Sequence, residues 1–243
     1  MSEPSTLEIL FEDEHLIAVA KPSGLFVHRS EKDRRQRVAA LQLTRDLAGQ
    51  DVYTIHRLDR ATSGVLLFGK TATAASQMSA CFARREVHKR YTALVRGHCP
   101  SSGRIDTPLV AARGRGLPAE HPFAAPQEAV TVYERTTAFE LPVAGPQFPT
   151  TRCSLVDVRP QTGRFHQIRR HLNYAAHPVI GDSSHGDSRQ NRVFREHLQV
   201  SRLMLAAVEL AFPHPVAKSQ VVIRCPPEAS FQQVVDRLQA FSV

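Results

Sequence analysis

His56-Arg57-Leu58-Asp59-Arg60-Ala61-Thr62-Ser63-Gly64, followed by Val65-Leu66-Leu67-Phe68-Gly69-Lys70, joins a polar loop to a short apolar run. A continuous apolar run of this length, bounded by turn residues, predicts a fully buried strand over 63–70. Loops supported by such rigid strands commonly carry functional groups. The segment therefore predicts both a central element of the core and a candidate site at its entrance.

Asp59 is the chemically distinctive residue of this loop. Arg57 and Arg60 flank it, and nearby cations favour the ionised form of a carboxyl group, so we expect Asp59 to be a carboxylate at neutral pH. An ionised aspartate can act as a nucleophile or a base but is a poor general acid. A purely structural role, in a salt bridge or a turn with Thr62 and Ser63, is the alternative.

Outward from this segment, short strands outnumber helices and do not alternate with them. Strands are predicted at 7–11, 16–20, 89–96, 131–141, 151–159, 202–212 and 220–225, and helices at 38–47, 71–85, 164–174 and 228–241. This pattern predicts an α+β fold with a large mixed, mostly antiparallel β-sheet flanked by helices and loops. We expect one domain over 1–243, with 100–126 as a loop or insertion.

A second polar cluster lies at residues 161–171, where the helix of 164–174 is expected to begin. Phe165, Ile168 and Leu172 recur at helical spacing and are expected to pack inward. Arg164, Gln167 and His171 recur on a polar face of the same predicted helix. A helix start after a glycine can bind a phosphate through its backbone N–H groups. A solvated basic face is the alternative interpretation.

The charge balance indicates a polyanionic partner. The 243 residues contain 31 Lys and Arg against 23 Asp and Glu, a net charge of +8. Basic residues concentrate in 29–45 and 164–202. Because arginine recognises phosphates and stacks on bases, this pattern favours nucleic acid as the partner, although a solvated basic surface would have the same composition.

Several classes of protein are excluded by what the sequence lacks. It has no apolar run long enough to span a membrane and no basic secretory leader. The four cysteines show no C-x-x-C spacing, which predicts reduced thiols in a cytoplasmic protein. Phosphate-binding, dinucleotide-binding and serine-hydrolase glycine motifs are absent, and the spacing of His166, His171 and His177 does not favour a metal site. We therefore expect no cofactor and no metal.

Six segments of this sequence resemble the conserved motifs of the RluA-type pseudouridine synthases. The matching segments, in order, are 21–28 (KPSGLFVH), 56–70, 89–91 (KRY), 162–169 (TGRFHQIR), 178–182 (PVIGD) and 202–205 (RLML). The resemblance implies the catalytic fold of that family, isomerisation of uridine in RNA without a cofactor, and no N-terminal S4-like domain. The sequence departs from the usual motif at Ala206 and at His185, where many relatives have histidine and tyrosine.

The same resemblance implies roles for individual residues. Asp59 matches the catalytic aspartate, which attacks C1′ or removes a 2′ proton. Tyr91 matches the tyrosine that stacks on the flipped uracil and helps to remove its C5 proton. Arg169 matches the basic residue that pairs with the aspartate. The implied RNA contacts and pocket residues are Arg57, Arg60, Arg164, His166, Gln167, Ile168 and Leu205.

The resemblance is strongest to the branch that modifies uridine 65 of tRNA, through residues 148–152 and 177–192. It implies RNA as the partner, tRNA first, with no membrane involvement. The expected protein is a cytoplasmic monomer. Ribosomal RNA as the substrate and an RNA-binding protein without catalysis are the alternatives.

Overall fold

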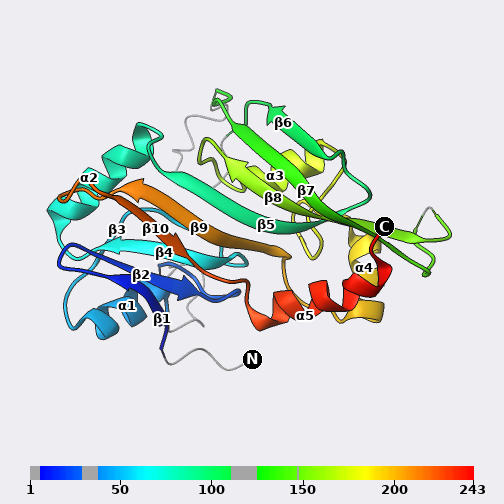
Figure 1. Cartoon of the computed structure of the whole chain (residues 1–243), viewed down its shortest axis with the longest axis horizontal. Helices are drawn as coiled ribbons and strands as arrows, with labels where there is room; N and C mark the ends of the chain where they lie inside the picture. Colours follow the sequence, from blue (N-terminus) through cyan, green and yellow to red (C-terminus); the bar gives the residue numbers. More distant parts are fainter. Residues whose placement is uncertain (1–5, 29–37, 111–124, 147) are drawn as a thin grey trace. The chain divides into compact units, whose positions relative to one another are not determined.

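The computed structural model describes residues 6–28, 38–110, 125–146 and 148–243, and its ribbon is shown in Figure 1. The strands are β1 (Glu8–Glu12), β2 (Leu16–Lys21), β3 (Tyr53–Thr54), β4 (Ser63–Gly69), β5 (His88–Arg96), β6 (Ser102–Asp106), β7 (Val130–Leu141), β8 (Thr151–Pro160), β9 (Leu205–Pro213) and β10 (Gln220–Arg224). The helices are α1 (Ala40–Ala48), α2 (Ala72–Ala83), α3 (Gln167–Tyr174), α4 (Ser188–Leu198), α5 (Ala229–Leu238) and a final 3₁₀ turn (Gln239–Phe241).

Hydrogen bonds order the strands as β1-β2-β4-β9-β5-β8-β7-β6, with β10 beside β9 and β3 beside β4. Among the pairs with a described register, only β4–β9 is parallel. The predicted fold class, α+β with a mixed and mostly antiparallel sheet, is confirmed. Contacts divide the chain into two compact units: unit 1 comprises 1–92 and 202–235, and unit 2 comprises 93–201 and 236–243. The prediction of a single domain stays a prediction.

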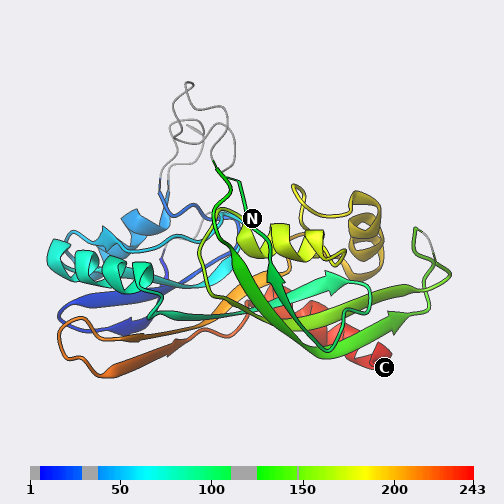
Figure 2. The ribbon, with the colours of Figure 1, turned by 90° about the horizontal axis from the view of Figure 1, so that it is seen from above.

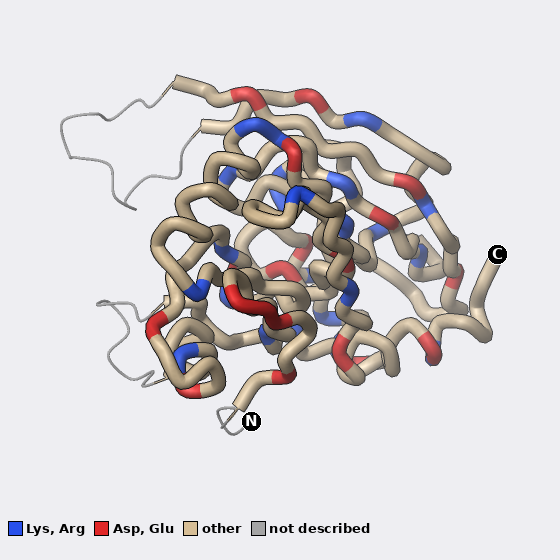
Figure 3. The backbone as a smooth tube through the Cα atoms, turned by 60° about the vertical axis from the view of Figure 1, so that its left-hand side comes forward, with Lys and Arg blue, Asp and Glu red and all other residues tan. Residues whose placement is uncertain are grey.

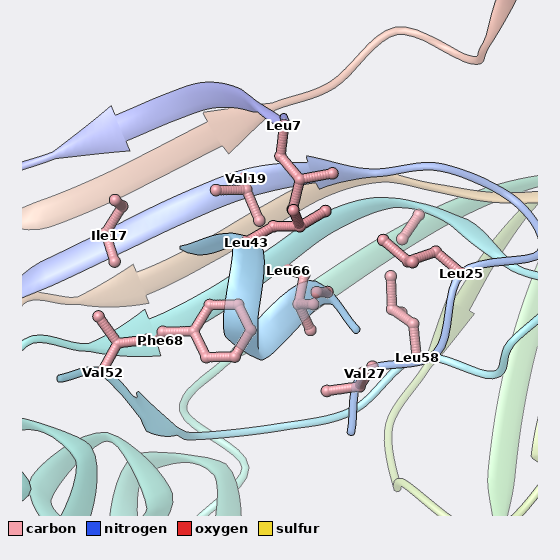
Figure 4. Packing of buried hydrophobic residues seen from close by; sticks show 12 residues of the cluster. Leu7, Ile17, Val19, Leu25, Val27, Leu43, Val52, Leu58, Leu66 and Phe68 are labelled. Carbon is pink, nitrogen blue, oxygen red and sulfur yellow. The ribbon is translucent and has the colours of Figure 1, made fainter. Parts of the chain in front are cut away.

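In unit 1 the central strands β2 and β4 are buried on both faces. Successive strand side chains point to opposite faces, and here they enter two different clusters. Ile17 and Phe68 pack with Leu43 of α1, as Figure 4 shows, whereas Leu67 packs with Met78 of α2. All seven residues of β4 are buried, which confirms the strand predicted from its continuous apolar run.

Gly64 allows the close approach of β4 and β9. It adopts a φ of +115°, and a Cβ atom at this position would lie 2.0 Å from the carbonyl oxygen of Ala207. Glycine is the one residue without a side chain and the one that tolerates this φ without steric cost. The parallel pairing of Ser63 with Ala206 and of Gly64 with Ala207 therefore depends on it.

In unit 2 the strands β7 and β8 form a long antiparallel pair, and β6 extends this sheet by pairing with β7. Helices α3 and α4 lie on the same side of these two strands (Figure 2). The residues of α3 that pack inward include Ile168 and Leu172, as their spacing predicts, while Phe194 anchors α4.

The structure corrects the expected elements in three places. Part of the expected loop at 100–126 is β6, whose backbone is satisfied by pairing with β7; residues 111–124 lie outside the described residues. Helix α3 begins at Gln167, not at residue 164, because His166 adopts a left-handed φ of 51°. Helix α4 was not predicted. Helix α2 is capped by Thr71, whose hydroxyl accepts the N–H of Ala74 at 3.1 Å.

Candidate active site

The Asp59 loop, residues 56–62, enters β4 in unit 1. The backbone carbonyl of Asp59 accepts a hydrogen bond from the N–H of Thr62 at 3.1 Å, which closes a turn directly before the strand. Leu58 is buried in the cluster that contains Leu25 and Val27 (Figure 4). Because its neighbour is anchored in the core, Asp59 is held half-buried at the surface of that core.

A second loop, residues 22–26, supports the Asp59 loop. The N–H of Gly24 donates to the Arg60 carbonyl at 2.8 Å, and the Ser23 hydroxyl donates to the Ala61 carbonyl at 2.8 Å. Arg60 Nε returns a bond to the Gly24 carbonyl at 2.9 Å, and its guanidinium lies 4.6 Å from the Phe26 ring centroid. These contacts give Arg60 a positioning role; its contact with RNA stays a prediction.

Tyr91 of β5 packs against the same cluster and lies within the electrostatic field of Asp59. Burial raises the pKa of the Tyr91 phenol well above its ordinary value, and the Asp59 carboxylate raises it further. A phenol held protonated is a poor base at neutral pH. The two roles that the resemblance implies for Tyr91, stacking on the uracil and help in removing its C5 proton, stay predictions.

Two further predicted residues of unit 1 lie around the Asp59 loop. Arg57 is exposed. Burial lowers the pKa of His28 in the KPSGLFVH segment, and the positive charge of Arg57 lowers it further. Leu205 is buried at the start of β9, directly before Ala206, which pairs with Ser63. Both residues are therefore close to the ends of the loop, and their contact with RNA stays a prediction.

His56, the first residue of this loop, has a structural role. Its Nε2 atom accepts the N–H of Leu67 at 3.0 Å, and its ring stacks on Phe82 at 5.1 Å. Burial lowers the pKa of His56 to about 4, and the charge of Lys89 contributes. A proton on Nε2 would remove the acceptor, so the folded protein holds this ring neutral.

We expect this histidine to make stability depend on pH. Its folded pKa lies below its unfolded value, so the unfolded chain binds the proton more readily and stability falls as pH falls from about 6.5 to about 4. The loss amounts to about 3 kcal/mol. Urea unfolding of the wild type and His56→Gln between pH 4 and 7.5 checks this. Equal pH dependence in both proteins would contradict it.

In unit 2, Gln167 fixes the turn before α3. Its Oε1 atom accepts from the Thr162 hydroxyl at 2.7 Å and from the Arg164 N–H at 2.9 Å. Its Nε2 atom donates to the Val130 carbonyl at 2.9 Å and to the Thr131 hydroxyl at 3.0 Å. A glutamine amide offers two donors and two acceptor lone pairs, and all four are used. Gln167 is therefore a buried residue with a structural role, and its contact with RNA stays a prediction.

His171 extends the same network. Its Nε2 atom faces the Thr107 carbonyl at 3.0 Å, which requires a proton on Nε2, so Nδ1 accepts from the Thr131 hydroxyl at 2.9 Å. Burial lowers the pKa of His171, consistent with a neutral ring. Of the predicted polar face, Gln167 and His171 are buried within unit 2, so the alternative of a solvated basic face does not hold for these two residues. Arg164 is half-buried and lies before α3.

Arg169 and Asp182 form a buried bidentate ion pair in unit 2. Nε and Nη2 of Arg169 lie 2.7 Å from the two carboxylate oxygens, and the side chains are only 6% and 0% exposed. Burial alone would raise the pKa of Asp182, but Arg169 and the N–H groups of Ser184 and His185 outweigh it and hold the pKa below its ordinary value. The pair fixes the direction of the guanidinium.

The 182–186 turn that carries Asp182 is itself tightly held. Asn191 of α4 accepts the Gly181 N–H at 2.8 Å and donates to the Asp182 carbonyl at 2.9 Å. A Cβ atom on Gly186 would lie 2.2 Å from that same carbonyl oxygen. Nδ1 of His166 and Nε2 of His185 are 2.8 Å apart, which joins the turn to the start of α3.

Comparison with known proteins now decides the family. Residues 15–174 match the family described as RNA pseudouridylate synthase, and this range includes Asp59, Tyr91 and Arg169. The chain belongs to the RNA pseudouridylate synthase family. It is 47% identical to tRNA pseudouridine synthase C of Pasteurella multocida and 41% identical to that of Vibrio vulnificus, covering 90% and 96% of both chains respectively.

Other members agree with this assignment. The chain is 45% identical to tRNA pseudouridine synthase C of Pectobacterium carotovorum over 97% of its own length but spans only 63% of that relative. Among solved structures, human RNA pseudouridylate synthase domain containing 4 matches with a TM-score of 0.73 and 25% identity, covering 96% of this chain and 93% of that one. The human domain containing 1 protein, at 23% identity and a TM-score of 0.72, shows the same fold.

For this pseudouridylate synthase, the structure places the predicted residues in two groups. Asp59, Arg57, Arg60, Tyr91 and Leu205 belong to unit 1, and the residues of the 164–169 segment belong to unit 2. Ile168 is buried, whereas Arg164 and His166 are half-buried; Arg164 Nε donates to the Glu128 carbonyl. Pairing of Arg169 with Asp59, and contact of Ile168, Arg164 and His166 with RNA, stay predictions.

The sequence analysis did not single out four residues that hold the site residues or their supporting loops. They are Lys21, which binds the Arg60 carbonyl; Asp182, which binds Arg169; Arg202, which binds Ser63; and Glu228, which binds Ser23. Lys21, Asp182 and Arg202 lie in segments that carry the family resemblance, so their positions in these motifs could have indicated a role. Glu228 lies outside those segments, and nothing in the sequence indicates its role. Within residues 6–28, 38–110, 125–146 and 148–243, no three His, Cys, Asp or Glu side chains come together in a way that could hold a metal ion.

Proposed function

We propose that this chain is a tRNA pseudouridine synthase that isomerises a uridine, at position 65, with Asp59 as the catalytic residue. The observation that carries the proposal is the Asp59 loop, in which a turn directly before β4 holds Asp59 half-buried and its carboxylate lies close enough to Tyr91 to raise the pKa of that phenol. The relatives named tRNA pseudouridine synthase C, 41–47% identical over most of this chain, support tRNA as the substrate.

The reaction exchanges one bond to the ribose for another. Asp59 either attacks C1′ or removes the 2′ proton, and in both routes the bond between N1 and C1′ breaks. The released uracil rotates and a bond forms between C5 and C1′; in the first route the bond between Asp59 and C1′ breaks as the new bond forms, and in the second the proton returns to C2′. C5 then loses its proton and N1 gains one. Atoms balance within the substrate, so the chemistry requires no second substrate. The structure supports both routes equally.

The protein's contribution is to extract and hold the base. A uridine in a helical stem must leave the stack before its glycosidic bond can be reached, which costs a few kcal/mol. Stacking on an aromatic ring offsets about 1–3 kcal/mol of that cost. Tyr91, held by the core cluster, would supply this platform. By the family resemblance, Arg169, whose direction Asp182 fixes, is the basic residue that pairs with and orients the catalytic aspartate.

Sequence-independent contacts would come from exposed cations. Figure 3 shows cationic and anionic residues interspersed along the described chain. Arg189, Arg192 and Arg195 of α4 are exposed, whereas residues 29–37 of the first basic stretch lie outside the described residues.

No described helix is long and apolar enough to cross a membrane. A cytoplasmic location and a monomeric state stay predictions.

Mapping the modified nucleotide tests the proposed substrate. Unmodified tRNA and ribosomal RNA transcripts are incubated together with the protein, and pseudouridine is located in each product by chemical derivatisation and primer extension. The expected result is one new pseudouridine in tRNA, at position 65. Modification of ribosomal RNA alone would overturn the tRNA assignment, and modification at another tRNA position would overturn the position.

A further inference from the structure

Through Glu228, the C-terminal segment of unit 1 contacts the 22–26 loop that supports the Asp59 loop. The carboxylate oxygens of Glu228 each lie 3.3 Å from the N–H of Ser23, and Glu228 also binds Nη1 of Arg202. Ser23 in turn donates its hydroxyl to the Ala61 carbonyl. One carboxylate, 205 residues away in sequence from Ser23, thus contacts the loop that supports the catalytic loop.

Arg202 provides a second connection. Its side chain is 6% exposed, and Nη2 donates to the Ser63 hydroxyl at 2.7 Å, at the start of β4. Nη1 also reaches the Ser230 hydroxyl at 3.1 Å. The guanidinium therefore ties Ser63, directly after the Asp59 loop, to Glu228.

Lys21 is a second buried cation at the same place. Its Nζ atom donates to the carbonyls of Pro22 at 2.8 Å, Leu25 at 2.9 Å and Arg60 at 3.1 Å. Burial lowers the pKa of Lys21 to about 7, and Glu228 is the strongest group opposing that shift. Three carbonyl acceptors require all three protons of an ammonium group. The charge of Glu228 therefore favours the protonation state that holds these loops.

We propose that Glu228 is a positioning residue for the reaction at Asp59: it compensates the buried cations Lys21 and Arg202 and fixes the catalytic loop through Ser23 and Arg202. The contacts hold the residues that directly follow Asp59, because Lys21 binds Arg60, Ser23 binds Ala61, and Arg202 binds Ser63. Glu228 is joined to Ser23 and Arg202 directly and to Lys21 through its charge. The catalytic consequence rests on the proposed function, whereas the fixing of the loop does not.

The test compares Glu228→Gln with Glu209→Gln. Glutamine keeps the shape of Glu228 but removes its charge. Glu209 is a matched control because it also pairs with an arginine in unit 1, Arg224 at 2.8 Å, on the β9–β10 pair. With tRNA as substrate, Glu228→Gln is expected to lower kcat about 10–100-fold while KM changes less than about threefold. Glu209→Gln is expected to leave both within about twofold.

Hydrogen–deuterium exchange of the RNA-free proteins separates loop positioning from catalysis. Peptides covering 21–26 and 59–64 are expected to exchange at least about tenfold faster in Glu228→Gln than in the wild type or Glu209→Gln. Glu228→Asp, which restores the charge, is expected to recover part of kcat and of the protection. Unchanged exchange, or an equal fall of kcat in Glu209→Gln, would overturn the proposal.

The two proposals fail in different ways. If the wild type does not modify tRNA, the proposed function falls, but the exchange comparison still decides whether Glu228 fixes the loop. If the wild type is active and Glu228→Gln retains full kcat with normal protection, only the positioning role falls. Urea unfolding of all four proteins shows whether a loss of kcat reflects unfolded protein.

Discussion

Asp59→Asn is expected to lower kcat for pseudouridine formation by about 10⁴-fold or more while leaving tRNA affinity within about threefold of the wild type. Asparagine has nearly the same shape, so the turn closed by the Asp59 carbonyl and the Thr62 N–H can persist. It lacks the anionic oxygen that both routes require, and losses of this size are typical when a catalytic nucleophile is removed.

Single-turnover kinetics and filter binding at a stated salt concentration measure the two quantities separately. Glu209→Gln, which removes a carboxylate from the same unit, is the matched control and is expected to keep wild-type kinetics. The salt concentration is fixed because phosphate contacts make RNA affinity strongly salt-dependent. An Asp59→Asn protein that retains more than about a tenth of the wild-type kcat would show that this carboxylate is not the catalytic group.

The second large effect is expected at Asp182. Asp182→Asn removes the anion that compensates the buried Arg169 guanidinium, and breaking a buried ion pair costs about 3–5 kcal/mol. We expect the lower end, about 3 kcal/mol, because the asparagine oxygen can still accept from Ser184 and His185. Activity is expected to fall as well, since Asp182 sets the direction of Arg169.

Urea unfolding at pH 7 checks the stability change. Glu196→Gln is the control in the same unit, because the Arg192–Glu196 pair on α4 is exposed at both ends and such pairs contribute about 0–1 kcal/mol. Equal free energies of unfolding for Asp182→Asn and Glu196→Gln would contradict the importance assigned to the buried pair.

Local patterns predicted those parts of the structure that depend on local interactions. Strand β4 follows from a continuous apolar run, and the cap of α2 follows from Thr71 at the start of a helical pattern. Asp59 could be singled out from its flanking arginines, and Tyr91 and Arg169 from motif resemblance. In each case the signal lies within a few residues of the feature.

Long-range contacts set the limit of that prediction. The expected start of α3 is wrong because His166 adopts a left-handed conformation and Gln167 fixes the turn before the helix. Gln167 does so through a hydrogen bond to Val130 of β7, more than 30 residues away in sequence. The partner of Arg169 within unit 2 is Asp182, brought close by a turn that Asn191 holds. Glu228 accepts a hydrogen bond from the N–H of Ser23, which lies near the other end of the chain. No local periodicity encodes such pairs.

The most direct test of the central claim is release of tritium from tRNA labelled at C5 of its uridines. Formation of the bond between C5 and C1′ must expel that atom, so release counts turnovers. Wild-type protein is expected to release one equivalent per tRNA, with none from a ribosomal RNA transcript and none from Asp59→Asn on either RNA. No release by the wild type from either RNA would contradict the assigned chemistry.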